Sequence, residues 1–204
     1  MTEDTPQVYL ITPRRIALQD FPDTLARLMD EVEIAAVRLA LDLDNEDDVA
    51  RAADAVRPIC HGRDVALVIE DHFRLVKRLG LDGVHVSGIQ KLRDIRKDLG
   101  PDPIVGSYCG ASRHDGLTAG EIGATYVSFG PLATSTLGTE DPAPADLFQW
   151  WSDVVEVPVV AEGGLTPEIC AGLRDHVDFI ALGTELWSAD TDPLSKLKSF
   201  VAAF

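Results

Sequence analysis

Two short glycine-containing turns are the clearest candidates for chemistry in this 204-residue sequence. Gly163-Gly164 and Gly183-Thr184 each follow an apolar, β-branched run, at the point where a predicted strand gives way to a helix. Backbone without side chains lets amide donors approach an anion there, so a monophosphate fits without a lysine. The alternative is that these glycines only form tight turns. Their paired placement after two consecutive predicted strands favours phosphate binding.

Charged side chains at other predicted strand positions could bind a substrate or a metal. Glu70-Asp71 closes an apolar run, where a carboxylate could ligate a hard cation such as Mg²⁺ beside a substrate phosphate. In so acidic a chain, the same acids could instead cap the next helix. Arg38 lies among Ala and Leu. Facing the interior of a closed sheet it would need an anionic partner, whereas facing the helices its stem would pack and its head would reach water.

His85 and Ser107 are the candidate catalytic residues. His85 lies in the run Gly83-Val84-His85-Val86, whose alternation could point the imidazole to the interior of the sheet. A histidine buried in the core is the alternative interpretation. Ser107 ends the next predicted strand. The sequence offers no Ser-His-Asp arrangement.

Short apolar runs alternate with segments of helical period throughout the chain, and this rhythm predicts a parallel sheet covered by helices. We count eight units, which favours a single (β/α)8 TIM barrel spanning residues 1–204, with the functional residues at the C-terminal strand ends. An open doubly wound sheet is the alternative, but no GxGxxG follows the first strand. The predicted strands are residues 8–11, 34–41, 65–69, 83–86, 104–107, 126–129, 157–161 and 179–182.

Several helix boundaries carry local signals. Asn45 and Thr166 are predicted N-caps, and Pro167 in the first turn strengthens the second of them. Gly80 and Gly123 are each followed within a few residues by an apolar strand, so both are predicted helix ends.

The net charge of −16 opposes binding to nucleic acid or to an anionic membrane surface. The three cysteines are far apart and include no CxxC pair, so we expect reduced thiols rather than a zinc site or disulfides. No signal peptide and no run of about 18 apolar residues is found, which predicts a soluble cytoplasmic protein. The sequence does not give the oligomeric state, so a homodimer stays open.

The order and spacing of seven blocks resemble the thiamine-phosphate synthase superfamily, which also contains the thiazole tautomerases. The likeness runs over most of the chain. The blocks are Tyr9-Leu10-Ile11-Thr12, Val68-Ile69-Glu70-Asp71, Gly80-Leu81-Asp82-Gly83-Val84-His85-Val86, Ile104-Val105-Gly106-Ser107, Tyr126-Val127-Ser128-Phe129-Gly130-Pro131, Thr134-Ser135-Thr136 and Pro158-Val159-Val160-Ala161-Glu162-Gly163-Gly164-Leu165-Thr166-Pro167-Glu168.

The resemblance implies a TIM barrel that joins 4-amino-5-hydroxymethylpyrimidine diphosphate to thiazole phosphate and expels pyrophosphate. It implies that Asp71 helps to bind Mg²⁺. From their own chemistry, Arg38 and Glu70 are the candidate substrate-binding residues. The phosphate would be held by Thr134, Ser135, Thr136, Gly163, Gly164, Gly183 and Thr184. The first three lie in residues 130–144, the longest predicted loop, and a loop of that length at a strand end favours an active-site role.

The sequence departs from its relatives at positions that bind anions or metal. The family pattern Gln-x-Arg-x-Lys in the second strand appears here as Arg38-Leu39-Ala40-Leu41-Asp42, which places an acid where the diphosphate would bind. The second Mg²⁺ aspartate appears as Gln90, and a lysine after the Thr-x-Thr motif appears as Leu137. Arg38, Arg14 or Arg15 could restore some positive charge.

Two other functions remain open. One is an isomerase like the thiazole tautomerases, in which His85, His72 or His114 would move a proton on a bound phosphorylated thiazole. The other is a barrel that binds a phosphorylated small molecule without turning it over.

Overall fold

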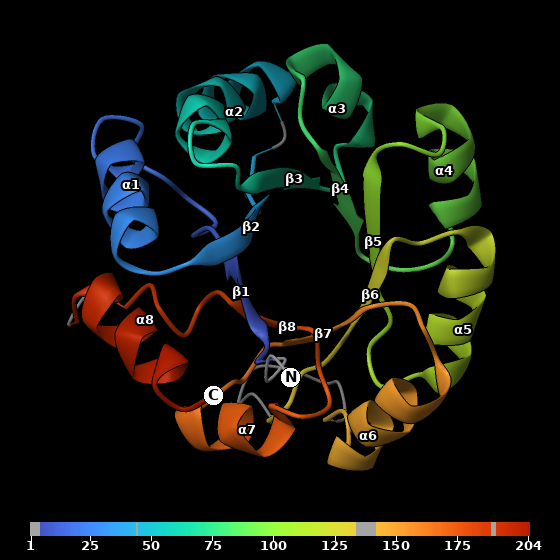
Figure 1. The fold of residues 1–204 in the computed structure, drawn as a ribbon. Coiled ribbons are helices and arrows are strands. Elements are labelled where there is room, and N and C mark those ends of the chain that lie inside the picture. The colour runs from blue at the N-terminus through green and yellow to red at the C-terminus, as the bar shows by residue number, and fades with distance from the viewer. Residues whose placement is uncertain (1–4, 44, 134–141, 189–190) are drawn as a thin grey trace.

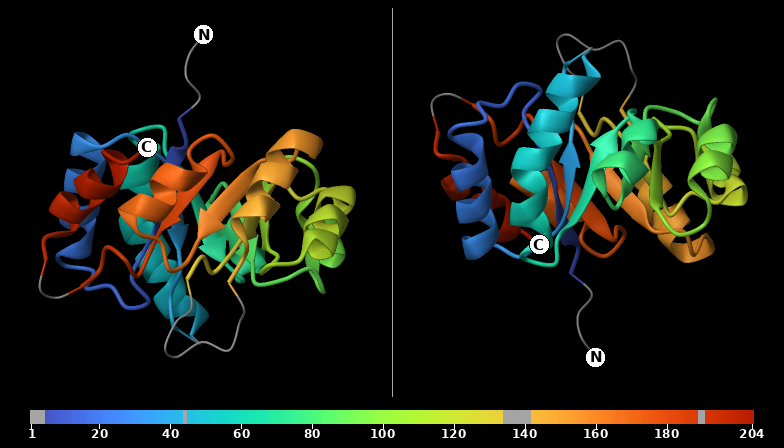
Figure 2. Two further views of the ribbon diagram at one scale, coloured as in Figure 1. Left: turned by 90° about the horizontal axis from the view of Figure 1, so that it is seen from below. Right: turned by 90° about the horizontal axis from the view of Figure 1, so that it is seen from above.

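Eight parallel strands close into a barrel, and eight helices surround it (Figure 1). The structure is a computed structural model that describes residues 5–43, 45–133, 142–188 and 191–204. Each strand pairs with its neighbours in sequence, and β1 (Gln7–Ile11) closes the ring against β8 (Phe179–Leu182). Views from the side show the helices wrapped around the strands (Figure 2). The predicted (β/α)8 barrel is confirmed.

The remaining elements alternate strictly between strand and helix. The strands are β2 (Ile34–Leu39), β3 (Ala66–Glu70), β4 (Gly83–Val86), β5 (Ile104–Tyr108), β6 (Tyr126–Phe129) and β7 (Val159–Glu162). The helices are α1 (Phe21–Glu31), α2 (Glu46–His61), α3 (Phe73–Leu79), α4 (Leu92–Leu99), α5 (Arg113–Ile122), α6 (Ala145–Val154), α7 (Pro167–Leu173) and α8 (Pro193–Val201).

Strand positions agree with the prediction, and the bounds of β4, β6 and β8 coincide with it. The second strand ends at Leu39 rather than at residue 41, because the Ala40 amide donates to Thr12 Oγ1 (3.0 Å) instead of continuing the ladder. The seventh begins at Val159 rather than at residue 157. Pro158 has no N–H to donate to a ladder, and the Val159 amide bonds to Asp178 Oδ2 (2.7 Å).

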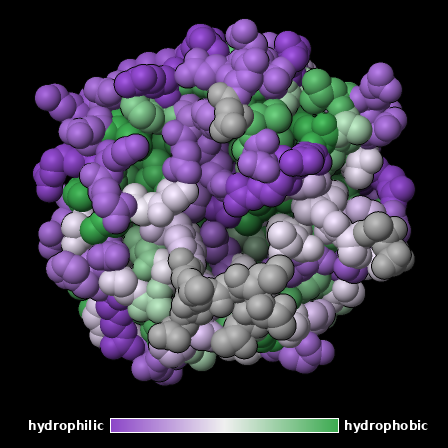
Figure 3. Space-filling view, turned by 180° about the vertical axis from the view of Figure 1, so that it is seen from behind, coloured by the Kyte–Doolittle hydropathy of each residue, from purple (hydrophilic) through white to green (hydrophobic). Residues whose placement is uncertain are grey.

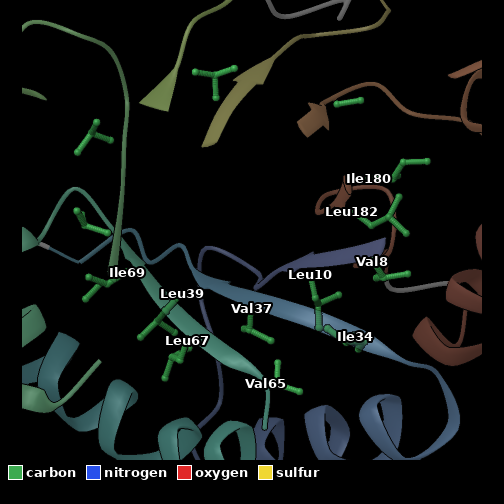
Figure 4. Close-up of a cluster of buried hydrophobic side chains, with 14 of the residues drawn as sticks. Val8, Leu10, Ile34, Val37, Leu39, Val65, Leu67, Ile69, Ile180 and Leu182 are labelled. Atoms are coloured by element: carbon green, nitrogen blue, oxygen red, sulfur yellow. The ribbon is translucent and has the colours of Figure 1, made fainter. Parts of the chain in front are cut away.

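The strands bury apolar side chains on their outer faces, against the helices. Figure 4 shows part of this layer, in which side chains of β1, β2, β3 and β8 lie between the sheet and the surrounding helices. The inner faces carry small residues and also larger polar side chains. The larger ones include Tyr9, Arg38, His85 and Tyr126. Alternation along each strand therefore decides which side chains reach the barrel interior.

The predicted helix boundaries are confirmed. Asn45 Oδ1 accepts from the Asp47 amide (2.9 Å), and Thr166 Oγ1 accepts from the Ile169 amide (3.3 Å). Gly80 and Gly123 end α3 and α5 in the left-handed conformation, with φ of 61° and 102°. Left-handed backbone favours glycine because a Cβ atom would clash there.

The side of the molecule turned away from the viewer in Figure 1 is mainly hydrophilic, and its hydrophobic areas are interrupted by polar side chains (Figure 3). Among the described residues, no helix combines the length and the apolar character that crossing a membrane requires.

Gly106 provides a test of packing inside the barrel, because a Cβ atom there would lie 2.0 Å from Cζ of Tyr126. We predict that Gly106→Ala lowers the free energy of unfolding by about 1–3 kcal/mol, since the Tyr126 ring cannot move without breaking its hydrogen bonds. Urea denaturation measures the change. Gly172→Ala in α7 is the matched control, because nothing lies within 4 Å of the added atom. Equal stability of the two variants would contradict this packing argument.

Candidate functional site

Both glycine turns line one pocket of about 350 Å³ at the carboxyl ends of β1, β7 and β8. Gly163 comes from the first turn, and Gly183 and Thr184 come from the second. Apolar walls are provided by Ile11 and Trp187, and Trp187 Nε1 donates to the backbone oxygen of Ile11 (2.7 Å). The structure thus brings together the two turns that the sequence singled out. A pocket at this end of a barrel is the usual position for a ligand.

Glu185 holds two backbone amides at this pocket. Its Oε2 accepts from the Gly183 amide (2.9 Å), and its Oε1 accepts from the Leu165 amide (3.2 Å). One carboxylate therefore joins the turn after β7 to the turn after β8. Sequence reasoning missed Glu185, because nothing in the sequence shows that the two turns lie within reach of one side chain.

Arg38 faces the barrel interior and is only 4% exposed. Its NH1 and NH2 groups donate to the two carboxylate oxygens of Glu162 at 3.0 and 3.2 Å. A buried guanidinium requires such an anionic partner, and a two-pronged pair is the strongest form of it. Burial lowers the pKa of Arg38, but Glu162, Tyr9 and Tyr126 together raise it more, so the net pKa is raised and Arg38 stays charged.

Glu70 joins this ion pair from β3. Its Oε2 lies 3.5 Å from Arg38 Nε, and its Oε1 pairs with Arg14 from the loop after β1. Two of the three arginines expected to restore positive charge, Arg38 and Arg14, are thus already paired with acids. Arg15 lies 3.9 Å from Asp42, and both of their side chains are largely exposed.

A chain of hydrogen bonds crosses the barrel below the ion pairs. The hydroxyls of Tyr9 and Tyr126 lie 2.7 Å apart, and the Tyr126 hydroxyl lies 2.9 Å from His85 Nδ1. His85 stacks on the Tyr126 ring and is 2% exposed. Burial lowers the pKa of His85 well below 6.5, with a smaller contribution from Arg38. The imidazole is therefore neutral, and burial likewise raises the pKa of Tyr126.

Ser107 is not brought to the barrel interior. It pairs in register with Val86 and Val127, and both of those residues belong to the layer packed under the helices. Ser107 is fully buried on that outer face, and its Oγ has no hydrogen-bond partner among the described residues. The catalytic role predicted for Ser107 therefore has no geometric support, because strand alternation turns its hydroxyl away from the pocket.

Asp71 and Gln90 line a second pocket, of about 380 Å³, together with Lys91. The Asp71 carboxylate accepts from both the amide and the hydroxyl of Ser87. Within the described parts of the chain, no three His, Cys, Asp or Glu side chains form a cluster that could hold a metal ion. The role of Asp71 in binding Mg²⁺ stays a prediction.

The positions where the sequence departs from its relatives can be placed in part. Ala40 is fully buried beside Thr12, whereas the Asp42 side chain is 72% exposed. Asp42 therefore points away from the packed interior. Four of the residues discussed above lie outside the described residues, so their predicted roles stay predictions: Thr134, Ser135, Thr136 and Leu137.

The fold and the pocket at the strand ends define a (β/α)8 barrel with its candidate ligand site at the carboxyl face. The family model of thiamine monophosphate synthase matches residues 8–186. The chain is 38% identical over 199 residues to a thiamine-phosphate synthase of Rhodospirillum centenum, covering 95% of each chain. It is 37% identical over 196 residues to that of Erythrobacter litoralis, covering 93% of this chain and 92% of the relative.

A solved structure of thiamine phosphate pyrophosphorylase from Pyrococcus furiosus superposes with a TM-score of 0.83 at 18% identity, covering 100% of this chain and 97% of the other. At this identity the superposition supports the fold alone. The sequence matches decide the family, and the chain belongs to the thiamine monophosphate synthase family.

The Arg38–Glu162 pair gives a prediction about stability. Arg38→Met should lower the free energy of unfolding by about 3–5 kcal/mol, because it leaves the part-buried Glu162 carboxylate without its partner. The double change Arg38→Met with Glu162→Met should restore most of the loss, and a double-mutant cycle by urea denaturation measures the coupling. Additive effects of the two single changes would show that the pair is not coupled.

His85 gives a prediction about pH. The folded state lowers the pKa of His85 below 6.5, so the unfolded chain takes up the proton first as the pH falls. Stability is therefore retained above pH 6.5 and lost below it, with a slope of up to about 1.4 kcal/mol per pH unit from this one group. Denaturation of wild type and His85→Gln between pH 7.5 and about 5 tests this. An equal slope in both proteins would exclude His85 as the source, and His176→Gln on the surface is the control.

Proposed function

We propose that this protein is a thiamine-phosphate synthase, which joins a pyrimidine diphosphate to thiazole phosphate. The carbon–oxygen bond to the diphosphate breaks, a carbon–nitrogen bond to the thiazole forms, and pyrophosphate leaves. Relatives of 38% and 37% identity carry this name, and they match nearly the whole chain. The observation that carries the proposal is the pocket in which both glycine turns meet, Gly163 with Gly183 and Thr184.

Each part of this pocket has a place in the proposal. The turns after β7 and β8 offer backbone amides for the monophosphate of the thiazole, because Gly163 and Gly183 have no side chains of their own. The Gly183 amide is bonded to Glu185 and has to exchange that partner for the phosphate. Ile11 and Trp187 form apolar walls against which a flat ring can pack. The Arg38–Glu162 pair forms a rigid floor, because both groups are held by two hydrogen bonds.

The diphosphate is assigned to the second pocket, which holds Asp71 and Gln90. The reaction needs positive charge around the leaving group. Lys91 lines this pocket and supplies one such charge. Asp71 offers a single carboxylate there, so a Mg²⁺ ion would have to be held largely by the phosphates of the substrate.

A second candidate is a barrel that binds a phosphorylated thiazole without turnover. It is favoured by the neutralised mouth, where Arg38 and Arg14 are paired with Glu162 and Glu70. With these cations occupied, less positive charge is available to stabilise a leaving pyrophosphate. Tight binding of thiazole phosphate by calorimetry, combined with no product, would decide for this candidate.

The coupling reaction has a direct test. Purified protein with pyrimidine diphosphate, thiazole phosphate and Mg²⁺ should release thiamine phosphate and pyrophosphate in equal amounts, measured by chromatography. Gly183→Val should raise the KM for thiazole phosphate by about tenfold or more, because its side chain enters the pocket beside Ile11. Gly172→Val, far from the pocket lining, is the matched control. No product above background at high protein concentration would exclude the transferase.

A further inference from the structure

The turns after β7 and β8 already hold an anion that the chain itself supplies. The Glu185 carboxylate accepts the amide hydrogens of Gly183 (2.9 Å) and Leu165 (3.2 Å). Glu185 lines the same pocket as Gly163 and Thr184. Backbone amides at such turns are the donors that a bound phosphate would use. A carboxylate thus occupies hydrogen-bond donors at the position where the proposed ligand places its phosphate.

The charges around the pocket do not favour a second anion. The lining contains the cations Arg14 and Arg38, which are paired with Glu70 and Glu162. Among the described residues, no salt bridge joins Glu185 to either arginine, and Lys196 Nζ donates to the backbone oxygen of Glu185 (3.1 Å) rather than to its carboxylate. In this part of the chain the two paired arginines face three carboxylates, those of Glu70, Glu162 and Glu185, and Lys196 adds a third cation beside the Glu185 backbone.

A phosphate and the Glu185 carboxylate cannot use the Gly183 amide at once. Two like charges about 4 Å apart repel each other, which weakens the binding of an anion by about tenfold or more. The carboxylate must therefore leave the amides before a phosphate can take its place, and the free energy of breaking its two hydrogen bonds is subtracted from the affinity of the ligand. A ligand that carries a neutral hydroxyl in place of the phosphate avoids this repulsion, because the hydroxyl can donate a hydrogen bond to the Glu185 carboxylate.

We propose that Glu185 is a specificity-determining residue, an internal anion that lowers the affinity of the pocket for phosphorylated ligands and is displaced when one binds. This inference rests on the proposed position of the phosphate at the β7 and β8 turns. It assigns to Glu185 the discrimination between a phosphorylated ligand and its dephosphorylated alcohol.

Calorimetry on the full chain tests the proposal with three probes: inorganic phosphate, thiazole phosphate and the thiazole alcohol. Glu185→Gln and Glu185→Ala should each lower the Kd for both phosphate probes by about tenfold or more, and leave the Kd for the alcohol unchanged or raise it. Glu168→Gln is the matched control. It removes the same charge from an exposed position at the start of α7, and should change the Kd for phosphate much less.

The opposite result is equally clear. If neither Glu185 variant binds phosphate more tightly than Glu168→Gln does, Glu185 only ties the two turns together and the proposal is wrong. Should both variants fail to fold, amide NMR of the wild type decides. Phosphate should shift the Gly183 and Leu165 signals, and unmoved signals overturn the proposal. If the Glu185 variants bind phosphate more tightly but the wild type forms no thiamine phosphate, the synthase proposal is wrong and the proposal for Glu185 holds. If the wild type forms thiamine phosphate but the variants leave the Kd for phosphate unchanged, the proposal for Glu185 is wrong and the synthase proposal holds.

Discussion

Burial of the Arg38 guanidinium inside the barrel is the constraint on which the mouth of this protein depends. A cation that is 4% exposed needs an anion within hydrogen-bond distance, and Glu162 at the end of β7 meets that need with two bonds. Glu70 adds a third contact and brings Arg14 to the same cluster. The carboxyl ends of β2, β3 and β7 are therefore held together by charge as well as by the ladders of the sheet.

This constraint shapes what the pocket can bind. Arg38 and Arg14 are paired with neighbouring acids, so under the proposed function the described donors left for a phosphorylated ligand are the backbone amides at the β7 and β8 turns. Those amides are in turn shared with Glu185. The charged side chains of the pocket are thus paired with one another. A ligand that uses the Gly183 or Leu165 amide has to replace the hydrogen bond that Glu185 makes to it.

The structure places the residues of the second strand that the resemblance singled out. Ala40 is buried beside Thr12 rather than open at the mouth, and Asp42 points to solvent. The terminal nitrogens of Arg38 both donate to Glu162, so this cation is not free for a bound anion. At Arg38 the second strand therefore contributes a structural ion pair.

The sequence by itself determined the barrel, its helix caps and the two glycine turns, because these depend on local periodicity and on backbone conformations that few residues adopt. Its family blocks also pointed to the correct family. Only the tertiary structure decided the partners of each charge, since Arg38, Glu162 and Glu70 come from strands far apart in the chain. It also decided that Ser107 faces the helices, because neighbouring residues of a strand point to opposite faces of the sheet and a shift of one position changes the face. Glu185 could not be assigned from the sequence, because its role depends on two turns that meet only when the barrel closes.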